Sequence, residues 1–383
     1  MGIDDKRIDK IPLGNDIPSQ DIISKIDIEA KNEIDDEDIS SETITNPFSP
    51  NDIRINTPPM NLGDLIDMIQ YKWINFGTDY QRAENLWSAK QQSRLIESAL
   101  LGLRLPAFYF EEVSKKQWNI IDGLQRCCSI RNFCVDQTLL LSELEFLSEY
   151  TGFTFDMLPF ELKRDIRMLP ITVNVLEAGV PKKVKYILFK RLNTGGIELT
   201  QQEIRNAVFK GKAIDVISRM SIDSNFLKST EGKIPTKRGH DKDFVSRFAS
   251  FYLNGYQNYK PDLENFINST MESINDGFFP DEDIRKMEED FSKANSLALQ
   301  IFGNDAYRKR DNSNKVRNRL NKAYFEVITT VFARLDEDKI LKLLTYKDCF
   351  ICNLITAMRD SKSYSYSFSG GTGGIDSVKR RFS

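Results

Sequence analysis

The sequence feature that most constrains the fold is an apolar stretch, Trp118 to Ile121, that leads directly into the dipeptide Asp122-Gly123. Aromatic and β-branched residues favour a strand, and Asp-Gly is a common turn. After the turn, the residues from Cys127 to Phe133 place apolar side chains at helical spacing. The chain is therefore predicted to pass from a strand through a tight turn into a helix.

Arg126 falls in the first turn of this predicted helix. Unpaired backbone N–H groups and the helix dipole favour an anion there, and a guanidinium makes paired hydrogen bonds to phosphate oxygens. The junction therefore indicates a phosphate site that includes Gln125 and Arg126. A structural alternative stays open, because Asp122 and Arg126 have the spacing of an i,i+4 ion pair on a helix surface.

Two further polar motifs flank this junction. Tyr80-Gln81-Arg82 stands about forty residues upstream, and Asn193-Thr194-Gly195-Gly196 stands about seventy residues downstream. Arg82 suits a phosphate, Tyr80 suits a sugar or a base, and the glycine-containing turn can present backbone N–H groups to an anion. By itself, the first motif also fits an ordinary loop in which Tyr80 packs on the core and Arg82 pairs with an acid. The second also fits a tight connection in which glycine supplies positive φ.

At these motifs the chain resembles the N-terminal domain family of the GmrSD-type restriction endonucleases, within the ParB/sulfiredoxin-like superfamily. The shared pattern is Tyr-Gln-Arg, a helix with Leu-Ile-x-Ser, a strand, Asp-Gly-x-Gln-Arg, and Asn-Thr-Gly-Gly followed by Leu-Thr and Glu. Similarity continues at Asp243 to Phe248, Phe302 to Arg308 and Arg381-Phe382, so the resemblance covers roughly residues 57 to 383. Leu124 stands where the family has glutamine, so that polar contact is absent.

The resemblance implies a ParB-like domain that binds, and hydrolyses, a nucleoside triphosphate with Mg²⁺. It assigns catalysis to Asp122, Gln125 and Arg126, with Asp122 also as the metal ligand. The implied nucleotide-binding residues are Tyr80, Gln81, Arg82, Gly123, Asn193, Thr194 and Gly195. The implied role is that of a sensor or regulator recognising DNA in a prokaryotic restriction-type or anti-phage defence system.

The hydrophobic pattern predicts an α+β protein, with a mixed α/β domain followed by a helical bundle, and the resemblance implies that the mixed domain is ParB-like. Capping boxes at Ser88 with Gln91 and at Thr200 with Glu203 mark two helix starts. Strands are expected at 107–111, 117–121 and 171–175, and helices at 62–69, 263–274, 283–301, 315–335 and 338–358. The predicted domains are an acidic disordered arm over 1–55, a ParB-like nucleotide-binding domain over 56–215 and a helical domain over 216–383.

Charge is distributed unevenly. Residues 1–53 contain 14 acidic and 5 basic residues, whereas the remainder contains 42 acidic and 48 basic residues. The arm alternates aspartate with isolated isoleucine and has no aromatic residue before Phe48, so we expect it to be disordered. A sharper hypothesis is that the arm mimics nucleic acid and occupies the basic site of its own protein until DNA displaces it.

A basic run near the end of the chain is the predicted DNA contact. Its members are Arg308, Lys309, Arg310, Lys315, Arg317, Arg319 and Lys322. One acid, Asp311, lies among these seven cations, so the run can neutralise several phosphates. A solvated helix face is the alternative interpretation.

Missing residue types narrow the chemistry. His240 is the only histidine, which excludes a His-Asn-His nuclease, a Ser-His-Asp triad and most zinc hydrolase sites on this chain. Any cutting would require a separate nuclease subunit or a carboxylate-bound metal. Cys349 and Cys352 lie in an apolar helical run and are expected to be buried. No Walker loop is present, so a nucleotide would have to use the ParB-like pocket.

The chain is expected to be cytoplasmic. No stretch approaches the length of a membrane span, the first residues do not form a signal peptide, and five cysteines are an odd number for a disulfide framework. The sequence indicates no oligomeric state. Two alternative functions remain open: a DNA-binding module without catalysis, and a metal-dependent nuclease that cuts with carboxylates such as Asp122.

Overall fold

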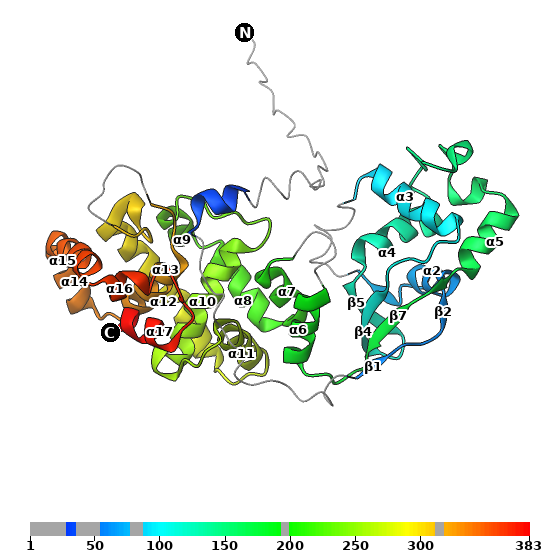
Figure 1. Cartoon of the computed structure of the whole chain (residues 1–383). Helices are drawn as coiled ribbons and strands as arrows, with labels where there is room; N and C mark the ends of the chain where they lie inside the picture. Colours follow the sequence, from blue (N-terminus) through cyan, green and yellow to red (C-terminus); the bar gives the residue numbers. More distant parts are fainter. Residues whose placement is uncertain (1–27, 36–53, 77–86, 193–198, 311–317) are drawn as a thin grey trace, which may run out of the picture. The chain divides into compact units, whose positions relative to one another are not determined.

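The computed structural model describes residues 28–35, 54–76, 87–192, 199–310 and 318–383 (Figure 1). These residues divide into two compact units. One contains Thr57–Val175, and the other contains Leu176–Ser383 together with residues 28–35 and 54–56. The predicted disordered arm therefore lies outside the described residues, apart from 28–35 and 54–55.

The first unit carries the strands. They are β1 (Ile55–Asn56), β2 (Met60–Asn61), β3 (Ile74–Asn75), β4 (Phe108–Ser114), β5 (Gln117–Asp122), β6 (Pro170–Ile171) and β7 (Val173–Leu176), of which β1 and the end of β7 lie at the border between the units. One sheet has the order β1-β7-β4-β5-β3, and β2 pairs antiparallel with β6. The strand expected at 171–175 is thus divided between the two sheets.

The first unit also contains helices. They are α2 (Leu62–Gln70), α3 (Ala89–Leu100), α4 (Leu124–Ile130), α5 (Phe160–Met168), the π-helical turn η3 (Arg131–Val135) and the 3₁₀ turns η4 (Ser148–Tyr150) and η5 (Phe155–Met157). The predicted capping box of Ser88 and Gln91 begins α3, as expected. The mixed α/β character predicted for this part of the chain is confirmed.

The β4–β5 hairpin forms as predicted. The strands are antiparallel, and Ser114 pairs with Gln117, so Lys115 and Lys116 make the turn. Phe108, Phe110 and Ile120 are buried and join a core to which α2, α3 and α4 contribute their apolar faces. Figure 1 shows these helices gathered beside β4 and β5. The hairpin thereby fixes where β5 ends and where α4 begins.

The second unit is helical, which confirms the predicted bundle. Its helices are α6 (Lys182–Leu192), α7 (Gln201–Val208), α8 (Lys212–Ser221), α9 (Ser224–Ser229), α10 (His240–Asn254), α11 (Leu263–Asn275), α12 (Asp281–Phe302), α13 (Lys322–Ala333), α14 (Glu337–Thr345), α15 (Lys347–Asp360), α16 (Lys362–Tyr366) and α17 (Ile375–Phe382), with 3₁₀ turns η7 (Tyr256–Asn258) and η8 (Gly303–Asp305). Thr200 caps α7 with Glu203, as predicted.

Aromatic side chains form the centre of the second unit. Phe325 of α13 contacts Phe244 with ring centroids 5.1 Å apart and Tyr307 with centroids 4.6 Å apart. Phe248 of α10 contacts Phe291 of α12 at 4.8 Å. Offset and edge-on contacts of this kind add to the free energy released when the rings are buried.

Two predicted helix ranges were wrong. The helix expected at 315–335 begins only at Lys322, because Leu320 is engaged in backbone bridges and Asn321 caps the helix. The helix expected at 338–358 is two helices, since α14 ends at Thr345 and α15 begins at Lys347.

The prediction that Cys349 and Cys352 are buried was also wrong, because both are exposed. Helix α15 buries only Met358, so most of its apolar positions are not part of the core. Cys127, Cys128 and Cys134 of the first unit are the buried cysteines, and burial in apolar surroundings raises the pKa of the Cys134 thiol to about 12.

Candidate functional site

The junction between β5 and α4 requires glycine at position 123. Gly123 has φ of +101°, in the left-handed region, and caps the N-terminus of α4. A Cβ atom at this position would lie 2.9 Å from Cδ1 of Phe108 and 3.3 Å from Cζ of Arg126. Both the backbone conformation and the close contacts exclude a larger residue.

Arg126 is buried beneath this turn, with 9% of its surface exposed. Its Nη1 donates to the carbonyl oxygens of Pro106 and Ala107, the latter at 2.9 Å, and its Nη2 donates to Oδ2 of Asp122. Its guanidinium lies over the Phe108 ring, 4.7 Å from the centroid. Arg126 therefore uses several of its donors to fix the end of the preceding loop to the start of α4.

Asp122 is the more accessible member of this ion pair. Its side chain is 35% exposed, against 11% for Arg126. Asp122 ends β5, where it pairs with Tyr109 of β4. The carboxylate is therefore held at a fixed position by the hairpin on one side and by the guanidinium on the other, while part of it faces solvent.

Gln125 belongs to a chain of polar contacts between α3 and α4. Its Oε1 accepts from the backbone N–H of Trp87 at 3.2 Å, and Nε2 of Gln92 donates to the Trp87 carbonyl at 2.9 Å. Asn132 in turn donates to Gln92 at 3.0 Å. Leu124, in contrast, is partly buried against the hydrophobic core.

Several predicted site residues lie outside the described residues. They are Tyr80, Gln81, Arg82, Asn193, Thr194, Gly195, Lys315 and Arg317. The described residues on either side of 77–86 both contact the α4 region. Trp87 donates to Gln125, and Phe76 lies under the guanidinium of Arg131, with its centroid 4.6 Å away.

The predicted DNA-binding arginines Arg308 and Arg310 make internal contacts in the second unit. Arg308 is 4% exposed and donates to the carbonyl of Asn318 at 2.6 Å, with Glu231 3.5 Å away. Arg310 donates to the carbonyl of Phe302 at 2.9 Å, and its guanidinium lies over the Phe302 ring. Arg319 is exposed.

An acidic segment, residues 28–35, packs against this basic run. Ala30 and Ile34 are buried, Asp35 donates its N–H to the Leu320 carbonyl at 2.8 Å, and Leu320 donates to the Glu33 carbonyl at 2.8 Å. The Asp35 carboxylate lies 3.0 Å from Lys309 and accepts from Asn321 at 3.0 Å. This part of the arm is ordered, which differs from the predicted disorder, because apolar burial and backbone hydrogen bonds stabilise it.

A buried ionic network in the second unit was not anticipated. Asp243 of α10 lies 2.9 Å from Arg205 of α7, 2.7 Å from Lys322 of α13 and 3.8 Å from Arg247. Burial alone would raise the pKa of Asp243, but these three cations hold it well below its ordinary range. In the sequence, only the i,i+4 spacing of Asp243 and Arg247 indicated an ion pair in this network, and that spacing does not show whether the pair is buried.

The network extends to the last helix. Glu326 of α13, which is fully buried, lies 3.5 Å from Arg247 and accepts from Nη2 of Arg381 in α17. Arg381 also donates to the carbonyls of Ser367 and Thr372. The segment 369–374 is thus fixed between α16 and α17.

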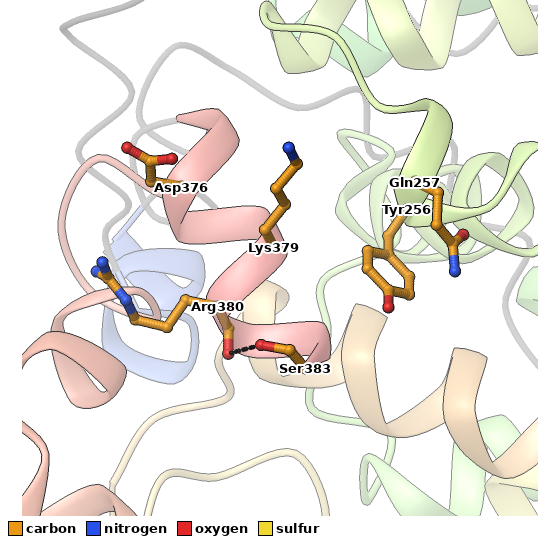
Figure 2. A pocket seen from close by; sticks show the side chains of 6 residues that line it. All are labelled: Tyr256, Gln257, Asp376, Lys379, Arg380 and Ser383. Carbon is orange, nitrogen blue, oxygen red and sulfur yellow. Dashed lines mark hydrogen bonds between the residues drawn. The ribbon is translucent and has the colours of Figure 1, made fainter.

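A hollow of about 650 Å³ lies beside α17 (Figure 2). Figure 2 shows Lys379 and Tyr256 on opposite sides of it, while Arg380 extends the other way. The Tyr256 ring also stacks on Phe382 with centroids 5.0 Å apart. None of the predicted site residues lines this hollow.

Two features are absent from the described residues. No group of three or more His, Cys, Asp or Glu side chains that could hold a metal ion lies there, so Asp122 belongs to no such group within the described ranges. No helix in the same ranges has the length and apolar character required to cross a membrane.

The comparisons with known proteins gave one match. Residues 62–210 match the family described as the GmrSD restriction endonuclease, N-terminal domain. The matched range runs from α2 through the β5–α4 junction to α7. This confirms the predicted resemblance for those residues. Searches of the curated proteins and of the solved structures found no match.

Proposed function

We propose that this protein is a nucleotide-dependent sensor of DNA in a restriction-type defence system, because residues 62–210 match the family of GmrSD restriction endonuclease N-terminal domains. The chain carries a domain of restriction-type proteins, and the nucleotide and DNA parts are our proposal. The observation that carries it is the β5–α4 junction, where a partly exposed carboxylate is held in place by a buried guanidinium.

The geometry favours a division of roles at this junction. Arg126 donates to two backbone carbonyls and to Asp122, so few of its donors remain for a ligand. We therefore propose that Arg126 positions Asp122, and that Asp122 holds Mg²⁺ or its bound water. A single carboxylate combined with substrate phosphates is a common way of binding this ion.

The remaining predicted residues would complete the site. We propose that Arg82 supplies the guanidinium for the phosphates, Gln81 and Tyr80 contact the sugar or base, and Gln125 orients phosphate or water. Gly123 would offer a backbone N–H group, whereas Asn193, Thr194 and Gly195, which belong to the second unit, stay predicted nucleotide-binding residues outside the described ranges. What supports this set is that the described residues on either side of 77–86 contact the α4 region.

The nucleotide proposal predicts that Asp122→Asn abolishes Mg²⁺-dependent phosphate release from the preferred nucleoside triphosphate. The substitution keeps shape but removes the charge that would bind the ion. Phosphate release from ATP, GTP, CTP and UTP, with and without DNA, measures this. Asp136→Asn, which changes an exposed carboxylate paired with Arg131, is the matched control. Undiminished turnover in a folded Asp122→Asn protein would contradict the assignment.

We further propose that DNA contacts the basic run of the second unit, with Lys309, Lys315, Arg317 and Arg319 on phosphates. Arg308 and Arg310 would support this surface from within, since both are held by carbonyl oxygens. The acidic segment 28–35 covers part of the run through Asp35 and Lys309. It would therefore compete with DNA phosphates for the same cation.

This competition predicts that the double variant Glu33→Gln and Asp35→Asn binds duplex DNA more tightly. Releasing Lys309 should steepen the dependence of log affinity on log salt by about 0.9 for each additional phosphate that the protein neutralises. Fluorescence anisotropy at several salt concentrations measures this, with Glu29→Gln on the same segment as control. Unchanged affinity and slope would mean that the segment only stabilises the fold.

Cutting would come from a separate nuclease subunit. The chain has a single histidine, so common histidine-dependent nuclease sites cannot be assembled from it. The proposed role is thus recognition and control, with the nucleotide state as the signal passed to the partner.

A further inference from the structure

Two aromatic side chains are exposed side by side just after α2. Tyr71 is 68% exposed and Trp73 is 37% exposed. Their ring centroids lie 6.2 Å apart, with an angle of 40° between the ring planes. Lys72 between them has φ of +58°, the left-handed conformation that ends the helix and turns the chain into β3.

The pairing of β3 with β5 brings the hairpin turn to these rings. Ile74 is opposite Trp118, and Trp118 donates its N–H to the Trp73 carbonyl at 2.9 Å. Because Trp118 follows the turn closely, Nζ of Lys116 lies 5.5 Å from the centroid of Trp73. The exposed cations Lys72, Lys115 and Lys116 thus accompany the two rings.

Two amide side chains continue the same edge of the sheet. Asn75 and Asn119 are neighbours in the β3–β5 register, and Nδ2 of Asn75 donates to Oδ1 of Asn119 at 3.0 Å. Glu111 pairs with Asn119 in the β4–β5 register. Glu112 pairs with Trp118 in the same register. The lysines therefore lie at the end with the turn, and the carboxylates of Glu112 and Glu111 follow along the strands.

We propose that the stacking patch, defined as Tyr71, Lys72, Trp73, Lys115 and Lys116, binds an unpaired segment of DNA. Exposed aromatic rings beside cations combine base stacking with phosphate attraction, which is how single strands are held without sequence reading. Lysine is depleted in the centres of protein interfaces, so three lysines around the rings favour a polyanion over a protein partner. The inference rests on the proposed recognition of DNA and gives the first unit a part in it.

The geometry selects one ring as the main platform. A base inserted between two rings needs about 7 Å, twice the roughly 3.4 Å spacing of stacked bases, and requires the rings to be parallel. The tilted rings of Tyr71 and Trp73 are too close for this. Lys116 lies over Trp73, and Tyr71 is the more exposed ring, so we assign the base to Tyr71 and the adjoining phosphate to Lys116.

The test is binding of a labelled single-stranded oligonucleotide of mixed sequence to the full chain, with the matching duplex as comparison. Tyr71→Ala should weaken single-strand binding roughly 5- to 150-fold, the loss expected for one stacked base. Tyr71→Phe should restore it, because the ring face is kept. Lys115→Gln with Lys116→Gln should reduce the salt slope by about 1.4, or about 0.7 for each phosphate no longer neutralised.

Matched controls come from the second unit. Tyr346 is 67% exposed and follows α14, so Tyr346→Ala removes an equally exposed ring elsewhere. Lys342→Gln with Lys347→Gln removes two charges from the same region. None of these controls should change single-strand affinity or the salt slope by more than the error of measurement.

The possible outcomes separate this inference from the proposed function. No binding of either DNA form by the unaltered chain would overturn both. Binding that persists in Tyr71→Ala and in the double lysine variant would overturn the stacking patch alone. A change in sedimentation of the Tyr71→Ala protein with unchanged DNA affinity would assign the patch to contact with a protein, and would also overturn the inference.

Discussion

Replacing Asp243 with asparagine is expected to lower the free energy of unfolding of the helical unit by about 3–5 kcal/mol. Asp243 is 6% exposed, and its carboxylate lies within 4 Å of Arg205, Lys322 and Arg247. Asparagine keeps the shape of the side chain but removes the negative charge that the three cations share. Removing one partner of a buried ion pair is strongly destabilising, because it leaves buried charge uncompensated. Urea unfolding followed by circular dichroism measures the loss.

The same residue should dominate the acid stability of this unit. Because the pKa of Asp243 is lower in the folded state than its ordinary value near 3.8, its contribution is fully present above that value. It is lost as the pH falls further, because the unfolded state then takes up a proton that the folded state does not. The unfolding free energy of the unaltered protein should therefore fall more steeply below pH 4 than that of Asp243→Asn.

Asp241 provides a matched control on the same helix. It is 4% exposed, but burial raises its pKa instead of lowering it. Its neutral form is favoured by the fold, so Asp241→Asn should change stability little or increase it. Equal losses in the two variants would show that removal of any buried carboxylate from α10 is harmful, and would contradict the role assigned to the network.

The second large effect is expected at Arg126. Arg126→Ala should lower the free energy of unfolding of the first unit by about 2–4 kcal/mol, because it leaves the carbonyls of Pro106 and Ala107 without their donor. It also removes the cation from beside the Phe108 ring. If Arg126 additionally contacts phosphate, nucleotide affinity should fall roughly ten- to a hundredfold, the loss of one charge-assisted hydrogen bond.

The two roles of Arg126 can be separated by a double-mutant cycle with Asp122→Asn. If Arg126 only positions Asp122, the double variant should lose no more nucleotide affinity than Asp122→Asn alone. If it binds phosphate directly, the losses should add. Thermal unfolding of each variant, and titration at a temperature where all remain folded, provide the readings. A stable Arg126→Ala protein would contradict the structural role.

The sequence correctly predicted those helix starts and turns that are determined by residues close together in the chain. The Ser88 and Thr200 capping boxes and the β4–β5 hairpin are settled within a few residues of chain, and each formed as expected. The order of α/β part before helical part followed from the change in hydrophobic period. The Gly123 turn was also predicted, although the sequence gave no sign that Phe108 and Arg126 both pack against it.

Interactions between distant parts of the chain were not predictable in this way. Arg381 contacts Glu326, and Asp243 contacts Arg205, across separations that no spacing rule covers. Arg308 and Arg310 looked like a surface run because charged residues are usually exposed, whereas their donors are taken by carbonyl oxygens. The helix predicted at 315–335 begins only at Lys322, because Leu320 forms a β-bridge with Ile34 near the other end of the chain.

The placement of the cysteines has a practical consequence. Cys127, Cys128 and Cys134 are buried in the first unit, whereas Cys349 and Cys352 are exposed on α15 of the second. Burial raises the pKa of the Cys127 thiol, and of Cys134, so little thiolate forms there at neutral pH. An alkylating reagent will therefore mark α15 at once and reach the other three only when the first unit opens. The rate at which the buried cysteines of the native chain are alkylated therefore reports the opening of the first unit alone.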